Sequence, residues 1–383
     1  MKELATDSPN DGPSMPERID TDGRVVVAMS GGVDSSVVAA WLADQGHDVV
    51  GISMRLYAEP KAAGKSCCSP DDLYDARAIA ASHGFPFYVA NYQQAFQERV
   101  VDYFVSEYRN GRTPSPCILC NDHLKFDILL ERMLALGGDT LVTGHYARIE
   151  ERDGRWQLLR GVDRRKDQSY FLFGLQRDVL PNIRFPLGGL VKHEVRELGR
   201  RLGVATADKA ESQDICFVGG GSYVDVLEEH FQEGDVKPGN LVRKSTGEVL
   251  GEHAGIHRFT VGQRRGLGIS YKEPLFVRSI DAASGTVFVG TRDEVNETTF
   301  TIERCNWLRW ECPPEEFEAV VKVRYRHQAV ACAVRMKEDG TGVVTLVEAE
   351  RGIAPGQAAV FYHGDEVLGG GWIDEVITSG DAA

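Results

Sequence analysis

The sequence predicts an α/β fold: a doubly wound parallel sheet, then a small, mostly β central domain, then a C-terminal β-barrel. Two observations support this prediction. From residue 24 to about residue 204, short apolar runs alternate with helical patterns, as in a parallel sheet covered by helices on both faces. Beyond residue 219 the helical pattern fades, apart from residues 222–231, and short alternating runs separated by glycine turns replace it.

The strands expected in the first half are short apolar runs, typical of buried parallel strands. They cover residues 25–29, 48–54, 87–90 and 140–143. The helices expected between and after them cover residues 35–45, 69–84, 93–108 and 119–136. Gly46 ends the first helix, and Ser69 and Pro70 supply a cap and a first-turn proline for the second. Ligands are therefore expected at the carboxyl ends of the strands.

The second half predicts β-structure throughout. A hairpin is expected over residues 275–290, and alternation of apolar and polar residues marks strands over 318–325, 329–336 and 342–347. The expected division is a flexible tail over 1–22, a catalytic domain over 23–218, a central domain over 219–293 and a barrel over 294–383. The tail lacks the features of a signal or transit peptide, and no apolar run approaches about 20 residues, so we expect a cytoplasmic protein without a membrane segment.

The charge of the chain is acidic overall and basic locally. Forty-three Lys and Arg oppose 57 Asp and Glu, a net charge of −14, which argues against a general nucleic-acid coat. Residues 148–166, however, hold seven basic against four acidic residues. Arg264-Arg265 and residues 324–327 add further basic points, the latter with Tyr325 available for stacking on a base. The pattern indicates local basic patches on an acidic background.

The segment Ser30–Ser36, SGGVDSS, follows the first expected strand and opens the first expected helix. Its glycines let the backbone approach an anion, and a helix start offers unpaired N–H groups. The spacing fits neither G-x-x-x-x-G-K-S/T nor G-x-G-x-x-G, and no lysine lies in the loop. The segment therefore predicts a phosphate-binding turn of another type, with an unoccupied tight turn as the alternative.

Three of the eight cysteines stand out by position. Cys117 and Cys120 form a C-x-x-C pair at the expected start of a helix, where the dipole lowers a thiol pKa, and Cys216 follows about 100 residues later. Three interpretations remain open: inert cysteines, ligands of a metal or iron–sulfur cluster, or a pair that carries sulfur. Cys67-Cys68 has no assigned role.

These motifs resemble those of known enzymes. The string SGGVDSS resembles the pyrophosphate loop of the ATP-pyrophosphatase superfamily, which splits ATP into AMP and pyrophosphate on an adenine nucleotide alpha hydrolase-like fold. Further blocks resemble, in the same order, those of the tRNA-specific 2-thiouridylases. They are Thr113–Phe126 (TPSPCILCNDHLKF), Thr143–Arg148, Lys166–Leu172, Ser212–Phe217 and Gly262–Gly268. The resemblance covers nearly the whole chain, ending at Gly356-Gln357.

The resemblance implies roles for individual residues. Cys120 would be the nucleophile, and Cys216 would carry a persulfide delivered by an upstream sulfur donor. Positions matching ATP contacts are Ala28, Met29, Ser30, Gly31, Gly32, Val33, Asp34, Ser35, Met54 and Gly144, with Asp34 toward the magnesium–pyrophosphate end. Positions matching tRNA contacts are Ser115, Pro116 and Cys117, which face the target base, and His145, Lys166, Asp167, Gln168, Arg324, Tyr325 and Gln357. Cys117 stands where many members have Asp. It would serve as an assisting group or, together with Cys120 and Cys216, as an iron–sulfur ligand.

The implied function is ATP-dependent 2-thiolation of the wobble uridine in the tRNA anticodon. Adenylation of the position-2 oxygen, with Mg²⁺, would create a leaving group, and the persulfide would supply sulfur. The enzymatic rival is another adenylating pyrophosphatase, such as an amidating or argininosuccinate-type synthetase, which needs no paired cysteines. A further rival is an iron–sulfur or RNA-binding module without turnover.

Overall fold

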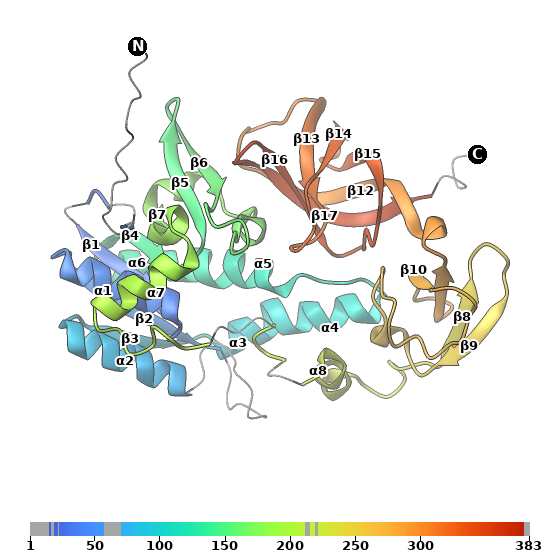
Figure 1. Cartoon of the computed structure of the whole chain (residues 1–383), viewed down its shortest axis with the longest axis horizontal. Helices are drawn as coiled ribbons and strands as arrows, with labels where there is room; N and C mark the ends of the chain where they lie inside the picture. Colours follow the sequence, from blue (N-terminus) through green and yellow to red (C-terminus); the bar gives the residue numbers. More distant parts are fainter. Residues whose placement is uncertain are drawn as a thin grey trace, which may run out of the picture.

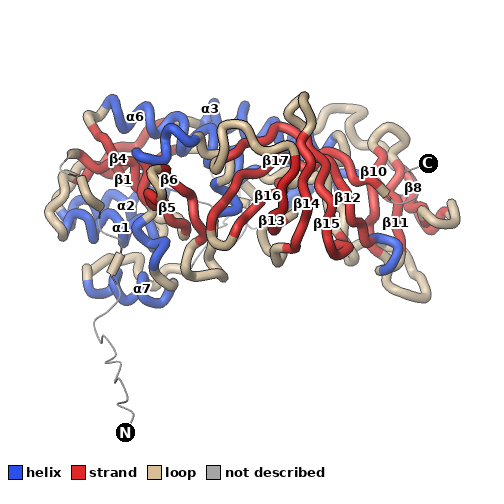
Figure 2. Tube along the Cα trace, turned by 90° about the horizontal axis from the view of Figure 1, so that it is seen from above, coloured by secondary structure: helices blue, strands red, loops and turns tan. Residues whose placement is uncertain are grey.

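The structure is a computed structural model, and it describes residues 15–16, 19–21, 23–56, 70–210, 215–218 and 221–378 (Figure 1). The pair Cys67-Cys68, residues 212–214 of one motif and most of the expected tail lie outside the described residues. Figure 2 shows helices concentrated at one end of the molecule and strands at the other. No helix in the described ranges has the length and apolar character needed to span a bilayer.

A five-stranded parallel sheet forms the first half, in the order β3-β2-β1-β4-β7. Its strands are β1 (Arg24–Ala28), β2 (Val49–Arg55), β3 (Phe87–Asn91), β4 (Gly138–Thr143) and β7 (Ile183–Arg184). Alternate residues of β1 face different cores: Val25 and Val27 belong to one hydrophobic cluster and Val26 to another. The sheet is therefore covered on both faces, which confirms the doubly wound prediction.

The helices divide between these two faces. The cluster of Val25 and Val27 includes residues of α1 (Val33–Asp44), α2 (Pro70–His83) and α7 (Lys192–Arg201). The cluster of Val26 includes residues from two longer helical segments. These segments are α3 (Gln93–Phe96) to α4 (Asp102–Arg109) and α5 (Pro116–Cys120) to α6 (Leu129–Ala135). Both contain a stretch of π-helix, Gln97–Val101 and Asn121–Ile128, which the sequence analysis does not predict.

The second half contains two β-units after α8 (Tyr223–His230). A four-stranded sheet has the order β10-β11-β8-β9, with the expected hairpin formed by β10 and β11. Its strands are β8 (Gly239–Arg243), β9 (Val249–His253), β10 (Phe276–Asp281) and β11 (Thr286–Gly290). Six further strands follow: β12 (Asn296–Trp307), β13 (Glu316–Lys322), β14 (Val330–Met336), β15 (Gly342–Arg351), β16 (Ala358–His363) and β17 (Glu366–Ile377). Pairing of β12 with β17 closes them into the predicted barrel.

A β-hairpin from the first half lies against this barrel. Strands β5 (Ala147–Arg152) and β6 (Arg155–Arg160) pair with each other, and β6 pairs with β17 at Leu159 and Glu366. The sequence predicts only a local basic patch over residues 148–166 and no hairpin. The hairpin extends the barrel sheet to eight strands and joins the two halves of the molecule (Figure 2).

Candidate active site

The segment between β1 and α1 is a tight turn that packs closely against the backbone of α2. Gly31 has a φ of +71°, and a Cβ there would lie 2.1 Å from the carbonyl oxygen of Asp72. The Ser35 hydroxyl accepts a hydrogen bond from the Ser30 N–H at 3.1 Å and thereby fixes the turn. Gly32 is the N-cap of the 12-residue α1, with no side-chain cap, so the first N–H groups of that helix remain available to an anion.

The positions that match ATP contacts come together at the carboxyl edge of the sheet. Ala28, the last residue of β1, pairs with Ile52 of β2 and Thr143 of β4. Met54 and Gly144 therefore emerge beside the loop that follows Ala28. A Cβ on Gly144 would lie 2.7 Å from the Ser35 nitrogen, so only glycine permits this contact.

Two lysines distant in sequence reach this loop. The Lys192 ammonium, at the first position of α7, contacts both carboxylate oxygens of Asp34 at 2.7 and 2.9 Å, and the Tyr146 hydroxyl donates to one of them at 2.8 Å. The Lys209 ammonium lies 3.3 Å from the Gly31 carbonyl oxygen and pairs with Asp72 at 2.7 Å. No lysine lies within the loop itself, and no sequence motif points to these two.

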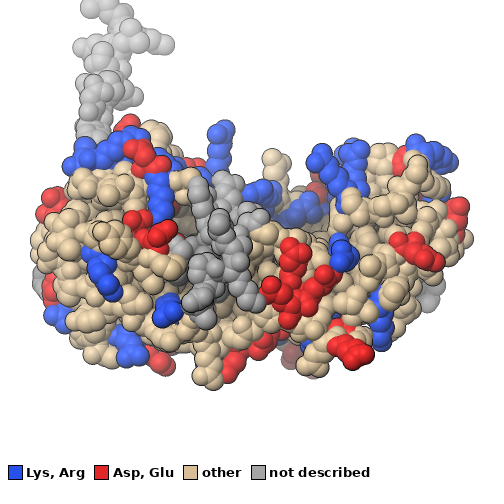
Figure 3. Space-filling model, turned by 90° about the horizontal axis from the view of Figure 1, so that it is seen from below, with Lys and Arg blue, Asp and Glu red and all other residues tan. Residues whose placement is uncertain are grey.

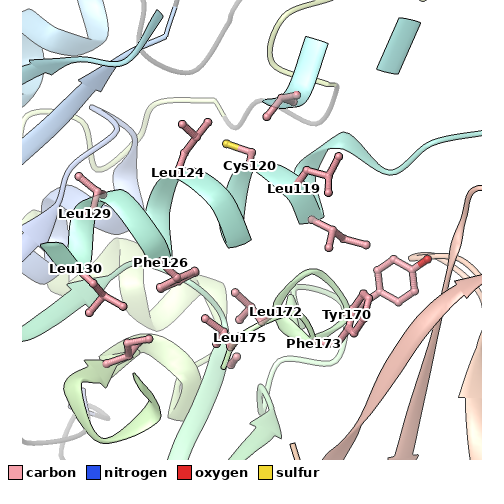
Figure 4. Packing of buried hydrophobic residues seen from close by; sticks show 14 of the residues in the cluster. Leu119, Cys120, Leu124, Phe126, Leu129, Leu130, Tyr170, Leu172, Phe173 and Leu175 are labelled. Atoms are coloured by element: carbon pink, nitrogen blue, oxygen red, sulfur yellow. The ribbon is translucent and has the colours of Figure 1, made fainter. Parts of the chain in front are cut away.

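Cys120 lies at the end of α5, where the helix continues in π form. Ser115 and Pro116 begin this helix, and both are buried. The side chain of Cys120 is 9% exposed, and it projects from the same side of the helix as Leu124, while Phe126 points toward Leu172 and Leu175 (Figure 4). π-Turns often occur at functional sites because they change the direction of side chains. Cys117, one turn earlier, is half-buried.

The structure brings Cys216 to the hydrophobic cluster that contains Cys120. Cys216 is half-buried and packs against this cluster. The ring of its neighbour Phe217 packs edge-on against Phe96 and Phe104, with centroids 5.9 and 5.1 Å away. The two cysteines, 96 residues apart in sequence, thus belong to or pack against the same extended cluster.

The same region does not form a metal site within the described residues. No three His, Cys, Asp or Glu side chains of this part of the chain are grouped so that they could hold a metal ion. The described part of the chain therefore supplies no three-thiolate cluster site from Cys117, Cys120 and Cys216.

Burial raises the pKa of Cys305 and of Cys332 to about 12, so these barrel thiols stay protonated at neutral pH.

The barrel fastens the chain that precedes Cys120. The Gln357 side-chain amide donates to the carbonyl oxygens of Thr113 and Pro114 at 2.9 and 3.2 Å, and the Thr113 N–H donates to Pro355 at 2.7 Å. One residue earlier, Arg112 pairs with Glu107 at 3.0 Å and with Asp374 of β17 at 2.9 Å. The start of the Cys120 helix is therefore held by two domains at once.

Comparison with known proteins identifies the family. Residues 23–220 match a family model described as "tRNA methyl transferase HUP domain". Residues 225–291 match "tRNA methyl transferase PRC-barrel domain", and residues 297–373 match "Aminomethyltransferase beta-barrel domain". The tRNA-specific 2-thiouridylase MnmA of Geobacter metallireducens is 49% identical, over 93% of this chain and 98% of its own. That of Acidobacterium capsulatum is also 49% identical, over 92% and 99%. The chain belongs to the tRNA-specific 2-thiouridylase family.

A solved structure titled as a 4-thiouridine synthetase–RNA complex with bound ATP also matches. It is 19% identical over 55% of this chain and 51% of its own, with a TM-score of 0.33. A score this low bears on neither fold nor function. The family assignment therefore rests on the sequence relatives, and it makes the chain an enzyme.

Several residues that match the 2-thiouridylase tRNA positions serve internal contacts. One Asp167 carboxylate oxygen accepts from the N–H groups of Gly161 and Ser169, both at 3.1 Å. The Gln168 side chain accepts from the Tyr146 N–H at 2.9 Å. Asp167 is buried, whereas Lys166 beside it is half-buried. Within this string, Lys166 and Gln168 are thus more accessible than Asp167.

Tyr325 and His145 both pack beside the helical segment that carries the thiol. Tyr325 packs on Phe171 with ring centroids 4.4 Å apart, and the Phe171 carbonyl accepts from the Asn121 side chain at 2.9 Å. The His145 ring packs between Phe126 and Phe185, and burial, followed by the nearby Lys125 charge, lowers its pKa well below the usual range. His145 is therefore neutral at physiological pH.

Asp122, which the sequence analysis does not single out, is a buried carboxyl two residues after Cys120. Burial, followed by the charge of Asp127, raises its pKa to about 8, and its Oδ1 has no hydrogen-bond partner within the described part of the chain. A Cβ on Gly174 would lie 2.0 Å from the other carboxyl oxygen, so the group packs directly against that backbone. Its only sequence signal is its place beside the C-x-x-C pair.

We expect Asp122→Asn to remove a pH dependence of stability. An unfolded Asp loses its proton near pH 4, whereas the folded protein keeps it up to about pH 8. The folded state thus binds more protons in this window, and wild-type stability falls as the pH rises through it. Urea unfolding should show that the variant gains about 3–4 kcal/mol over wild type between pH 5 and pH 8. Asp178→Asn, at an exposed position, is the control, and equal slopes in the two variants would refute the assignment.

Proposed function

We propose that this chain catalyses ATP-dependent 2-thiolation of the wobble uridine in tRNA. The observation that supports the proposal is that Cys216 packs against the hydrophobic cluster that includes Cys120, in a chain whose glycine-rich loop lies at the carboxyl edge of the same domain. Near-full-length similarity to proteins named tRNA-specific 2-thiouridylase supports it. A carboxylate-adenylating synthetase would have no use for the two cysteines.

In the first step, ATP would bind with its phosphates on the backbone of residues 30–35. The uridine O2 attacks the α-phosphorus, the bond to the β-phosphate bridging oxygen breaks, and pyrophosphate leaves. The N–H groups at the start of α1 and the Lys192 ammonium, 2.7 Å from Asp34, would stabilise the charge on the leaving group. The O2 then leaves readily as part of AMP, whereas oxide would not.

Mg²⁺ would enter this step together with ATP. The described residues hold no group of three metal-binding side chains, and the loop itself contributes one carboxylate, that of Asp34. Such a site fits a cation that keeps phosphate oxygens and water as most of its ligands. When bound, Mg²⁺ neutralises negative charge on the phosphates.

In the second step, Cys216 would deliver sulfur from a persulfide loaded by an upstream donor. The terminal sulfur attacks C2 and AMP leaves; the Cys120 thiolate then attacks the Cys216 sulfur, which frees the thiocarbonyl and leaves a Cys120–Cys216 disulfide. Attack by Cys120 on the persulfide first, with hydrosulfide as the nucleophile at C2, gives the same products. An external thiol reduces the disulfide before the next turnover. Burial of Cys120 supports exclusion of water from the activated base.

The test is nucleoside analysis of unmodified tRNA after incubation with the purified protein, ATP, a cysteine-persulfide sulfur donor and an external thiol that reduces the Cys120–Cys216 disulfide. We expect 2-thiouridine, with one AMP and one pyrophosphate released per thiolation, and no product when the wobble uridine is replaced by cytidine. Because matched family models carry the words "methyl transferase", a parallel reaction contains S-adenosylmethionine. A methylated nucleoside there, or no thiolated product in the first reaction, would refute the proposal.

We expect Gln357→Leu to slow thiolation about tenfold while leaving tRNA affinity unchanged. The substitution removes both hydrogen bonds to Thr113 and Pro114, which position the start of the Cys120 helix. Single-turnover thiolation and filter binding measure the two quantities. If Gln357 instead contacts tRNA, as its match to the family implies, the dissociation constant will rise and the single-turnover rate at saturating tRNA will be kept. Gln45→Leu, at the exposed end of α1, is the control.

A further inference from the structure

A basic pocket lies where the central sheet joins the barrel. Its volume is about 410 Å³, and its lining comes from the segment before β12, the turn after β13 and the end of β15. The charged and ionisable side chains of the lining are Arg292, Arg324, Arg326, His327, Glu350 and Arg351. Four guanidinium groups thus face one carboxylate in a chain whose net charge is −14.

The arginine cluster of this pocket differs from the basic run over residues 148–166. There, Arg148 pairs with Glu150 at 2.7 Å and with Asp365 at 2.9 Å, and Arg155 pairs with Glu366 at 2.7 Å. Those charges therefore join the β5–β6 hairpin to the barrel. In the pocket, the one lining carboxylate, Glu350, is already paired with the His327 ring at 2.9 Å.

His327 gives a second indication of a ligand. Its side chain is 7% exposed, its Nε2 contacts Glu350, and its Nδ1 is buried without a hydrogen-bond partner among the described residues. A buried polar atom without a partner is unfavourable by about 1–3 kcal/mol, and such atoms are uncommon in native structures. A ligand in the pocket that His327 lines would give this ring a polar neighbour.

The pocket is connected to the active site through adjacent residues. Arg324 and Arg326 flank Tyr325, whose ring packs on Phe171 at 4.4 Å. The Phe171 carbonyl accepts a hydrogen bond from Asn121, the residue after Cys120. Arg324 is itself fixed, because it donates to the carbonyl oxygens of Arg351 and Gly352 at 3.0 and 3.2 Å. A group held in the pocket therefore has a defined position relative to the thiol.

We propose that this pocket binds a backbone phosphodiester of the tRNA substrate. Planar guanidinium groups match phosphate oxygens in a bidentate manner, and a cluster of arginines with one carboxylate favours an anion of this type over a base edge. Figure 3, which shows one face of the molecule, has Lys and Arg side chains at the edges of the hollow between the two lobes, so the acidic chain does carry local basic surface. The inference deepens the proposed function and rests on it for the identity of the RNA.

The test measures tRNA affinity by filter binding between 50 and 300 mM salt, with the full-length protein and unmodified tRNA. We expect Arg292→Ala and Arg326→Ala each to weaken binding about three- to tenfold at low salt. Each should also reduce the slope of log affinity against log salt by about 0.7–0.9, the signature of one lost phosphate contact. Arg326→Lys should retain part of the affinity. Arg292→Ala and Arg326→Ala should weaken binding of tRNA with cytidine at the wobble position by the same factor as binding of unmodified tRNA, because a phosphate contact does not depend on the identity of the base.

Arg335→Ala is the matched control, since Arg335 is an arginine on β14 of the same barrel with a side chain 70% exposed. Its salt slope should equal that of wild type. Slopes for the Arg292 and Arg326 variants that equal the control would overturn the proposal. Unchanged tRNA binding with loss of sulfur transfer from a protein donor would also overturn it, in favour of an acidic partner protein. If no thiolated product forms but the slopes change as expected, the proposed function fails and the phosphate site stands.

Discussion

Cys120→Ser should lower formation of 2-thiouridine by about a thousandfold or more, while pyrophosphate from the first adenylation is still released in the presence of tRNA. The serine hydroxyl can neither attack the Cys216 sulfur as a thiolate nor form the disulfide, but it leaves the ATP loop intact. Cys120 lies on the helix that Gln357 and Pro355 fasten, far in sequence from residues 30–35, so the two half-reactions should separate. Nucleoside mass spectrometry and a pyrophosphate assay measure them in one reaction.

Cys216→Ser should also nearly abolish formation of 2-thiouridine, but the two variants should differ in whether they accept labelled sulfur. The Cys120→Ser protein should accept labelled sulfur from a persulfide donor, and the Cys216→Ser protein should not. Cys312→Ser, at an exposed position of the barrel, is the control and should retain activity and labelling. Full thiolation by either the Cys120 or the Cys216 variant would contradict the sulfur pair.

Lys192→Ala should lower the rate of pyrophosphate release about a hundred- to a thousandfold. The Lys192 side chain is 12% exposed, and its ammonium contacts both oxygens of Asp34 beside the loop. Removing it takes away a preorganised positive charge where the leaving group develops negative charge, an effect of about 3–4 kcal/mol in comparable sites. Steady-state release of pyrophosphate at saturating tRNA is the measurement, and Lys192→Arg should recover part of the rate.

The role of Lys192 can be separated from general damage to the fold. Lys337→Ala, at an exposed barrel position, should behave as wild type. The Lys192→Ala protein should bind tRNA with unchanged affinity, because the side chain contacts Asp34 and lies over the Tyr146 ring at the sheet edge. A normal rate of pyrophosphate release would remove Lys192 from the adenylation step.

The parts of the fold that depend on local pattern were predictable from the sequence. Buried parallel strands such as β1 are continuous apolar runs, and the hairpin of β10 and β11 has its turn residues between two β-like segments. The β5–β6 hairpin was not predicted, because its charged residues conceal the alternation of Ile149 and Leu158 with polar neighbours. Its partner β17 lies about 200 residues further along the chain, and the sequence contains no local signal for such a pairing.

The candidate site shows the same division. The loop before α1 and Cys120 stand in motifs whose spacing is visible in the sequence. Lys192 and Lys209 stand in no motif, and they reach the loop across 158 and 178 residues through the packing of α7 and the segment after it. The fastening of Thr113 by Gln357 spans 244 residues, so a match to tRNA-contact positions was the only signal that this glutamine carried.

The pairing of β17 with both β12 and β6 has a consequence for biosynthesis. The residues that hold Thr113 and Arg112 lie at positions 355–374, so the ribosome makes them more than 200 residues after Cys120. A nascent chain can complete the parallel sheet and its anion-binding loop long before it can anchor the helix that bears the thiol. The start of the helix that bears Cys120 is thus anchored only after β17 has been made, and a ribosome that stalls before this strand releases a polypeptide with the parallel sheet assembled and that helix unanchored.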